Sequence, residues 1–142
     1  MKKQGSILIE VIAAVMILTL TTTFIISTSI QNLDILKERI LLEEVNRSVY
    51  NLTNELKYNI SKEEIEELLK DDKIGFKYDS NFSKRLFDEN VKKLERGNDI
   101  EVSKIGVNNV GLKIKIKANI KIEKSEVSIE NEFTKSWWMD EI

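Results

Sequence analysis

The side chains available for chemistry in this chain of 142 residues are few in kind. The chain has no Cys and no His, so it lacks thiolates, disulfides and imidazole general bases. It also has no Gly-rich phosphate loop and no G-x-S-x-G segment. We therefore expect no enzyme activity, no catalytic residue, no cofactor and no metal site. Among the remaining carboxylates and amines, one carboxylate, that of Glu10, lies in an unusual place.

Glu10 is the only ionisable residue in an apolar run of 24 residues from Ile7 to Ile30. As a helix, the segment 6–30 is roughly 37 Å long, which is enough to cross a hydrocarbon core of about 30 Å. Lys2 and Lys3 precede it, and the positive-inside rule places that end in the cytoplasm. The sequence thus predicts a single-pass protein of the cytoplasmic membrane whose C-terminal domain is extracytoplasmic.

The segment and its carboxylate each allow a second interpretation. Small residues at 27–29 are typical of a peptidase site, which would make the segment a removed signal peptide, although the run exceeds the usual apolar region of about 7–15 residues. Glu10 either lies near the cytoplasmic edge, where it reaches water, or marks a cationic partner, because an unpaired carboxylate in lipid costs a few kcal/mol. The residues before Glu10 favour the second interpretation.

Those residues carry a family resemblance. Lys2, Lys3, Gln4 and Gly5, then Ser6-Ile7-Leu8-Ile9-Glu10 and a long apolar helix, resemble the leader and cleavage signature of type IV prepilins and pseudopilins. The resemblance implies that a prepilin peptidase cuts between Gly5 and Ser6, that Ser6 is then N-methylated, and that Glu10 becomes the fifth residue of the mature chain. Ser6 stands where the family commonly has Phe. The chain has no Pro, whereas the family has one at the position of Ser27.

The resemblance also implies a role for Glu10. Cleavage exposes an α-amine at Ser6, whose reference pKa of about 7.7–8.0 leaves it largely cationic near neutral pH. In a filament, the amine of a staggered neighbour can lie beside Glu10 and fix the axial register of the subunits, as one buried polar residue does in a coiled coil. The expected partners are the prepilin peptidase, other pilin or pseudopilin subunits, a membrane assembly platform and the lipid bilayer.

Three roles remain open within that resemblance: minor pilin of a type IV pilus, component of a competence filament, and pseudopilin of a secretion system. The small domain without cysteines favours a minor pilin, exposed at the cell surface once assembled. The alternative from another class is a single-pass membrane protein with an extracytoplasmic partner-binding domain that does not polymerise.

The apolar spacing predicts the architecture. Apolar residues recur every three to five positions from Leu33 to Leu56, so we expect one helix from about Ser6 to Tyr58 with an amphipathic second half. The expected organisation is a leader at 1–5, a transmembrane and filament-core helix at 6–30, its amphipathic continuation at 31–60 and an α+β head domain at 61–142. We expect this helix to cover a small antiparallel sheet, as in a pilin.

Smaller elements are expected between the helix and the sheet. Ser61 and Glu64 form a capping-box pattern before a short helix at 62–70. Alternation at 73–78 indicates a short strand, and apolar spacing from 82 indicates a helix that ends near 97.

The last third of the chain predicts a three-stranded meander over 100–105, 112–122 and 127–133. Aliphatic residues alternate with lysines in the second strand and with glutamates in the third. A turn at 123–126 would place Ile122 opposite Val127, Ile120 opposite Ile129, Ile116 opposite Phe133 and Lys117 opposite Glu132. Because the acidic strand neutralises the lysine row, no direct binding of nucleic acid is expected.

The C-terminal Trp137 and Trp138 are open to two interpretations. They either pack back on the domain or form a contact patch for a neighbouring subunit. The sequence favours neither.

Overall fold

A computed structural model describes residues 2–136 and residue 138. The chain divides into two units, residues 1–37 and 38–142, and each is considered by itself. The N-terminal unit is helical, whereas the second unit contains the end of that helix and every strand. The fold class is α+β, as the sequence predicts.

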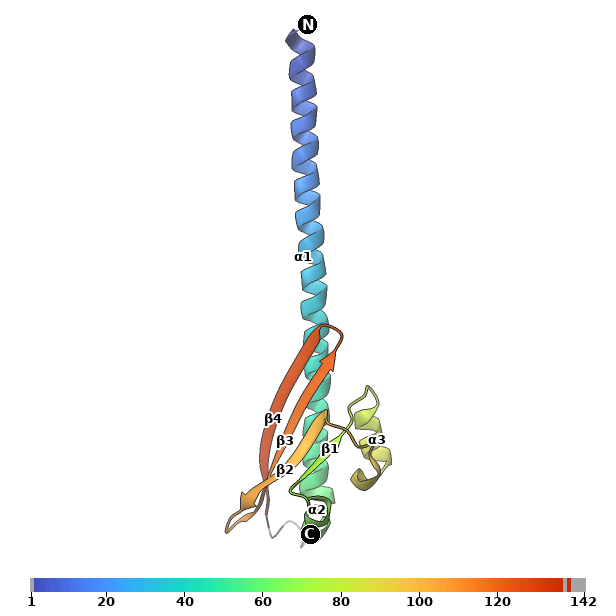
Figure 1. Cartoon of the computed structure of the whole chain (residues 1–142), viewed down its shortest axis with the longest axis vertical. Helices are drawn as coiled ribbons and strands as arrows, with labels where there is room; N and C mark the ends of the chain where they lie inside the picture. Colours follow the sequence, from blue (N-terminus) through green and yellow to red (C-terminus); the bar gives the residue numbers. More distant parts are fainter. Residues whose placement is uncertain (1, 137, 139–142) are drawn as a thin grey trace. The chain divides into compact units, whose positions relative to one another are not determined.

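The long helix α1 runs from Lys2 to Asn54 and continues as one π-helical segment, η1, from Glu55 to Asn59 (Figure 1). This confirms the prediction of a single N-terminal helix that reaches residue 58. The helix ends because Ile60 is extended and Ser61 starts a new cap. The apolar stripe is buried only in its last part: Val45, Val49 and Leu52 are buried, whereas Leu36 and Ile40 are about half exposed.

The sheet has four antiparallel strands in the order β1-β2-β3-β4. Their bounds are Lys73–Phe76, Ile100–Val107, Gly111–Ile122 and Ser125–Ser136. The expectation of three strands was wrong, because β1 pairs with β2 and places Ile74 opposite Val102. Four residues carry too little alternation to show which strand they will join, and the pairing depends on a segment more than twenty residues away.

The predicted register of β3 and β4 was also wrong, by two residues. Ile120 lies opposite Val127, Ala118 opposite Ile129, Ile114 opposite Phe133, and Lys117 opposite Glu130. A shift of two residues keeps every side chain on its own face, so alternation does not distinguish the two registers. The turn decides, because it contains only Glu123 and Lys124 and holds Glu123 at a φ of 52°.

Two short helices and a 3₁₀ turn complete the second unit. Helix α2, Lys62–Leu68, has the predicted capping box: Ser61 Oγ accepts a hydrogen bond from the Glu64 amide, and the Glu64 carboxylate accepts one from the Ser61 amide. Helix α3, Phe82–Asp88, is shorter than predicted. It stops because Glu89 is extended and Asn90 caps a separate 3₁₀ turn, η2, at Val91–Lys93.

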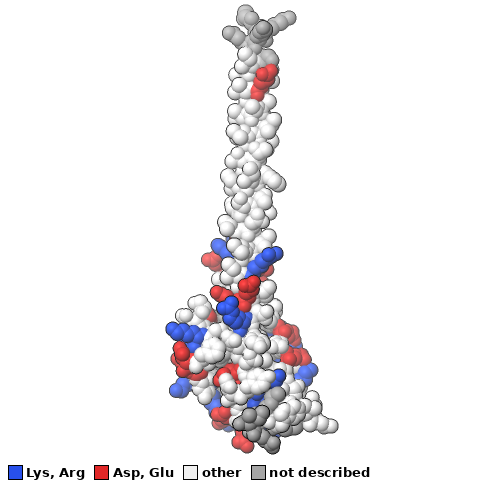
Figure 2. All heavy atoms as spheres, turned by 180° about the vertical axis from the view of Figure 1, so that it is seen from behind, with Lys and Arg blue, Asp and Glu red and all other residues white. Residues whose placement is uncertain are grey.

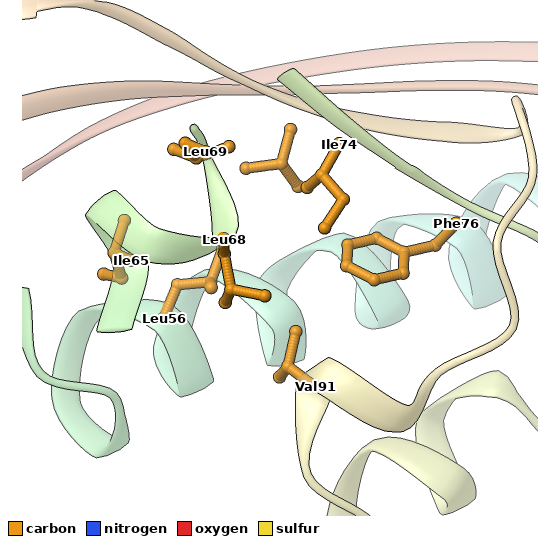
Figure 3. Close-up of a pocket in the computed structure, with 8 residues that line it drawn as sticks. Leu56, Ile65, Leu68, Leu69, Ile74, Phe76 and Val91 are labelled. Atoms are coloured by element: carbon orange, nitrogen blue, oxygen red, sulfur yellow. The ribbon is translucent and has the colours of Figure 1, made fainter. Parts of the chain in front are cut away.

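The core of the second unit lies between one face of the sheet and the last part of α1 with η1. Its members are buried aliphatic and aromatic residues from every strand, α2, α3 and η2: Leu41, Val45, Val49, Leu52, Leu56, Ile60, Ile65, Leu69, Phe76, Phe82, Leu86, Val91, Leu94, Ile100, Val102, Leu112, Ile114, Ile116, Ala118, Ile120 and Val127. Beneath α2 the aliphatic side chains and Phe76 leave an apolar cavity of about 10 Å³ (Figure 3). A cavity of this size and lining is a packing defect with no room for a ligand.

Candidate functional site

The apolar surface of the N-terminal unit is the largest candidate site. None of its apolar window is buried within the chain, and Leu18, for example, is 65% exposed. By length and composition the helix Ile7–Asn59 can cross a membrane, a property shared by signal sequences near an N-terminus. An aliphatic surface of this extent needs an apolar environment, which lipid or other helices can supply.

The threonines of this helix satisfy their hydroxyl groups within the helix. Thr19 Oγ1 donates to the Met16 carbonyl at 2.8 Å, and Thr22 Oγ1 donates to the Leu18 carbonyl at 2.8 Å. Thr21, Thr23 and Thr28 donate in the same way to carbonyls three or four residues earlier. Because each of these hydroxyl groups donates to a carbonyl of its own helix, none of them needs water as an acceptor.

Glu10 lies on α1 as an exposed residue within this aliphatic surface. Figure 2 shows a long uncharged surface along the helix with one acidic group near its N-terminal end, and charges of both signs over the rest of the chain. The role of this exposed carboxylate as a register residue stays a prediction.

Gly5 and Ser6 lie on the first turns of α1. A Cβ added at Gly5 would meet nothing within 4 Å, and its φ is negative. By contrast, a Cβ at Gly75 or Gly111 would collide with the backbone of a neighbouring segment. Close packing therefore explains those two glycines but not Gly5, which lowers helix stability by roughly 0.5–1 kcal/mol relative to Ala.

The terminal tryptophans are only partly described. Trp137 lies outside the described residues, whereas Trp138 follows β4 and is 55% exposed. An exposed indole is a suitable contact group, and the role of the pair as a subunit contact stays a prediction.

The solvent face of the sheet carries ordered charge pairs instead of an open basic row. Lys113 Nζ lies 2.8 Å from a Glu132 carboxylate oxygen, and Lys115 pairs with Glu130. The hydrogen bond and charge of Lys113 lower the pKa of Glu132 below its usual 4.5. Within the described part of the chain, no cluster of three Asp or Glu residues is arranged to hold a metal ion.

Sequence reasoning missed one buried cation. Lys135 on β4 is 1% exposed, and its Nζ donates at 2.9 Å to the carbonyl of Lys57 in η1. Nearby, the Asn131 amide donates to Thr53 Oγ1 at 3.0 Å, a second link between β4 and α1. Alternation from Val127 through Phe133 places residue 135 on the apolar face, and that signal was available in the sequence.

Fold and site together define a class: an α+β protein whose N-terminal helix is long and apolar enough for a single membrane span. Comparison with protein-family models, curated proteins and solved structures gave no match.

Proposed function

We propose that this chain is a structural subunit, a minor pilin, of a type IV pilus-like filament. A prepilin peptidase removes residues 1–5 on the cytoplasmic face, Ser6 is methylated, and a membrane assembly platform moves the subunit from the bilayer into the filament. The helix then leaves lipid for the filament core, and the head domain lies on the outside, at the cell surface. Pilus, competence and secretion filaments all remain compatible with this proposal.

One observation carries the proposal: an aliphatic helix surface with no cover from its own chain holds one carboxylate, four residues after Ser6. Lipid alone accounts for the aliphatic surface, but it gives no reason for an acidic residue. A bundle of such helices accounts for both, because a neighbouring α-amine can pair with Glu10 in an environment of low dielectric constant. The ion pair between Glu10 and that α-amine then forms only when the two helices have the correct axial offset.

Gly5 supports the same proposal. The residue occupies a helix, has a negative φ and has space for a side chain, so folding gives no reason for glycine. Recognition by a peptidase that needs a small residue before the scissile bond does give a reason.

The first experiment determines the mature N-terminus of the full chain by mass spectrometry after expression with a prepilin peptidase. We expect the unaltered protein to begin at Ser6, and Gly5→Leu to remain uncut and begin at Met1. Ala13→Leu adds the same bulk further along the helix and should be processed normally. A Met1 terminus in the unaltered protein supports the non-polymerising anchor and overturns the proposal, as does a terminus near residues 27–29, which indicates a signal peptide.

The second experiment separates processing from assembly. Glu10→Gln keeps the size of the side chain and removes its charge, so we expect normal cleavage and membrane insertion with incorporation into sheared filaments reduced at least about tenfold. Glu10→Asp keeps the charge on a shorter side chain and should retain part of the incorporation. Equal incorporation of the Gln variant and the unaltered protein would refute the register role of Glu10.

A further inference from the structure

The two edges of the sheet differ in whether another segment of the chain covers them. The outer edge of β1 is covered by residues 95–97: the Gly97 amide donates to the Gly75 carbonyl at 3.3 Å, and the Lys77 amide donates to the Glu95 carbonyl at 3.0 Å. This cover lies so close that a Cβ at Gly75 would collide with it. No further strand can pair with the β1 edge without displacing that segment.

The opposite edge is β4, twelve residues long, and no described strand pairs with its outer side. Figure 1 shows β4 as the outermost strand, on the side of the sheet away from β1 and α3. Among the described residues, β4 forms backbone pairs with β3 alone, and its register runs without a bulge or a proline. Counted from the closing pair Ile122 and Ser125, the backbone groups of the even-numbered residues face outward, and from Glu126 to Glu132 these residues are exposed.

Natural edges of this length are usually blocked by a bulge, a proline or an inward-pointing charge placed mid-strand. The only described charge on the inner face of β4 is Lys135, which lies at the end of the strand and is already bonded to Lys57. Over most of its length β4 therefore retains the outward donors and acceptors that a fifth strand requires.

Charge on the solvent face alternates from strand to strand. Lys73 on β1 pairs with Glu101 on β2, Glu101 lies opposite Lys117 on β3, and the β3 lysines pair with glutamates on β4. The outermost strand presents Glu126, Glu130 and Glu132. If this alternation continued, a strand added beside β4 would carry basic residues on the solvent face.

On the inner face of β4, Asn131 and Lys135 bond to α1 and η1, but the apolar side chains of this face are not all covered. Val127 is buried, whereas Ile129 and Phe133 pack against the core but remain partly exposed. An added strand with aliphatic residues on that face would complete their burial.

A second copy of this chain is a poor occupant. Antiparallel pairing of β4 with another β4 about Ile129 would place Glu126 opposite Glu132, and like charges directly opposite each other are destabilising. The β1 edge of a second copy is already covered by its own residues 95–97. Neither edge of an identical sheet fits.

We propose that the outer edge of β4 is a docking site for an extended segment of a different protein, in which Lys or Arg alternates with aliphatic residues. The segment adds as a fifth strand, its backbone pairs with the even-numbered residues of β4, its cations lie beside Glu126, Glu130 and Glu132, and its aliphatic side chains cover Ile129 and Phe133. This inference does not depend on polymerisation, since it concerns only the sheet of the second unit.

The chain itself supplies a probe. A fluorescent peptide with the sequence of residues 111–122 has the required alternation of lysine and aliphatic side chains. The matched control peptide replaces its four lysines, Lys113, Lys115, Lys117 and Lys121, with glutamate. We expect the full chain in mild detergent to bind the basic peptide at least about tenfold more tightly than the acidic one, as measured by fluorescence anisotropy.

Variants locate the binding edge. Ser128→Pro removes an outward amide, leaves the backbone hydrogen bonds to β3 in place and should abolish binding. Ser128→Ala loses the same side-chain hydrogen bond, from Ser128 Oγ to Asn119 Oδ1 on β3, but keeps the amide, and it should bind as the unaltered protein does. Near-ultraviolet circular dichroism checks that both variants are folded. If the proline variant does not fold, Glu126→Lys with Glu130→Lys replaces it, and the preference should then reverse toward the acidic peptide.

Three results would overturn the proposal. They are no binding of the basic peptide, equal binding of the two peptides, and binding that the edge variants leave unchanged. The last result would mean that the peptide displaces β3 instead of adding beside β4. Failure of filament assembly would leave this result unaffected, so the two proposals can fail separately.

Discussion

The two parts of α1 contain similar aliphatic residues in opposite surroundings. Leu18 in the N-terminal unit is 65% exposed, whereas Leu52 in the second unit is 0% exposed. Both belong to one continuous helix, so helix formation does not account for the difference. The sheet covers one part, and none of the described residues covers the apolar window of the other. The aliphatic surface of one helix can therefore be covered by its own domain at one end and require lipid or other subunits to cover it at the other.

The largest expected effect comes from truncating one leucine to alanine in each of these two parts and comparing the losses of stability. Leu52→Ala removes a fully buried side chain and should lower the free energy of unfolding of the second unit by about 2–5 kcal/mol. Leu18→Ala should leave that free energy unchanged within about 0.5 kcal/mol. Urea unfolding of the full chain in detergent, followed by near-ultraviolet circular dichroism, measures both, and equal losses would contradict the comparison.

A smaller effect is expected for the buried cation that links β4 to η1. Lys135→Ala leaves the Lys57 carbonyl without its donor and should cost about 1–3 kcal/mol. Lys117→Ala, on the solvent face of the same sheet, is the matched control and should change stability by at most about 0.5 kcal/mol. If the two variants unfold at the same urea concentration, the link contributes nothing.

The cap of α2 gives the next effect. Ser61→Ala removes an acceptor for the Glu64 amide and should destabilise the second unit by about 1 kcal/mol. Ser29→Ala in the N-terminal unit removes a hydroxyl from the middle of a helix and should have no such effect. Hydrogen exchange of the α2 amides reports the change locally, and unchanged protection in Ser61→Ala would show that the cap is dispensable.

The smallest effect concerns pH. Hydrogen bonds and charges from Lys92 and Lys113 lower the pKa values of Glu67 and Glu132 below 4.5. Because both folded-state pKa values are lowered, the stabilisation is fully present above 4.5 and is lost as the pH falls through the folded values. Both carboxylates are exposed, so we expect only a small fall in the melting temperature between about pH 6 and about pH 3, and a smaller one in about 1 M salt. A melting temperature that rises over this interval would contradict the assignment.

Prediction from sequence succeeded where a pattern repeats over many residues. The helix up to residue 58, the capping box at Ser61 and the alternation of β3 and β4 each follow from local spacing. It failed for the pairing of β1 and for the β3–β4 register, since both depend on contacts distant in sequence or on one turn residue, Glu123. Gly5, Ser6 and Glu10 were predicted as site residues from their order in the chain, and that stays a prediction. The open edge of β4 has no signal within β4 itself.

The sequence by itself determined the long N-terminal helix, the strands of the last third with their apolar faces, and the place of one carboxylate in an apolar helix. These properties depend on side-chain type and on spacing along the backbone. Only the tertiary structure decided that β1 joins the sheet, that residues 95–97 cover its edge and that β4 remains open. The physical reason is that every strand begins with two unpaired edges, and the path of the rest of the chain decides which of them is covered.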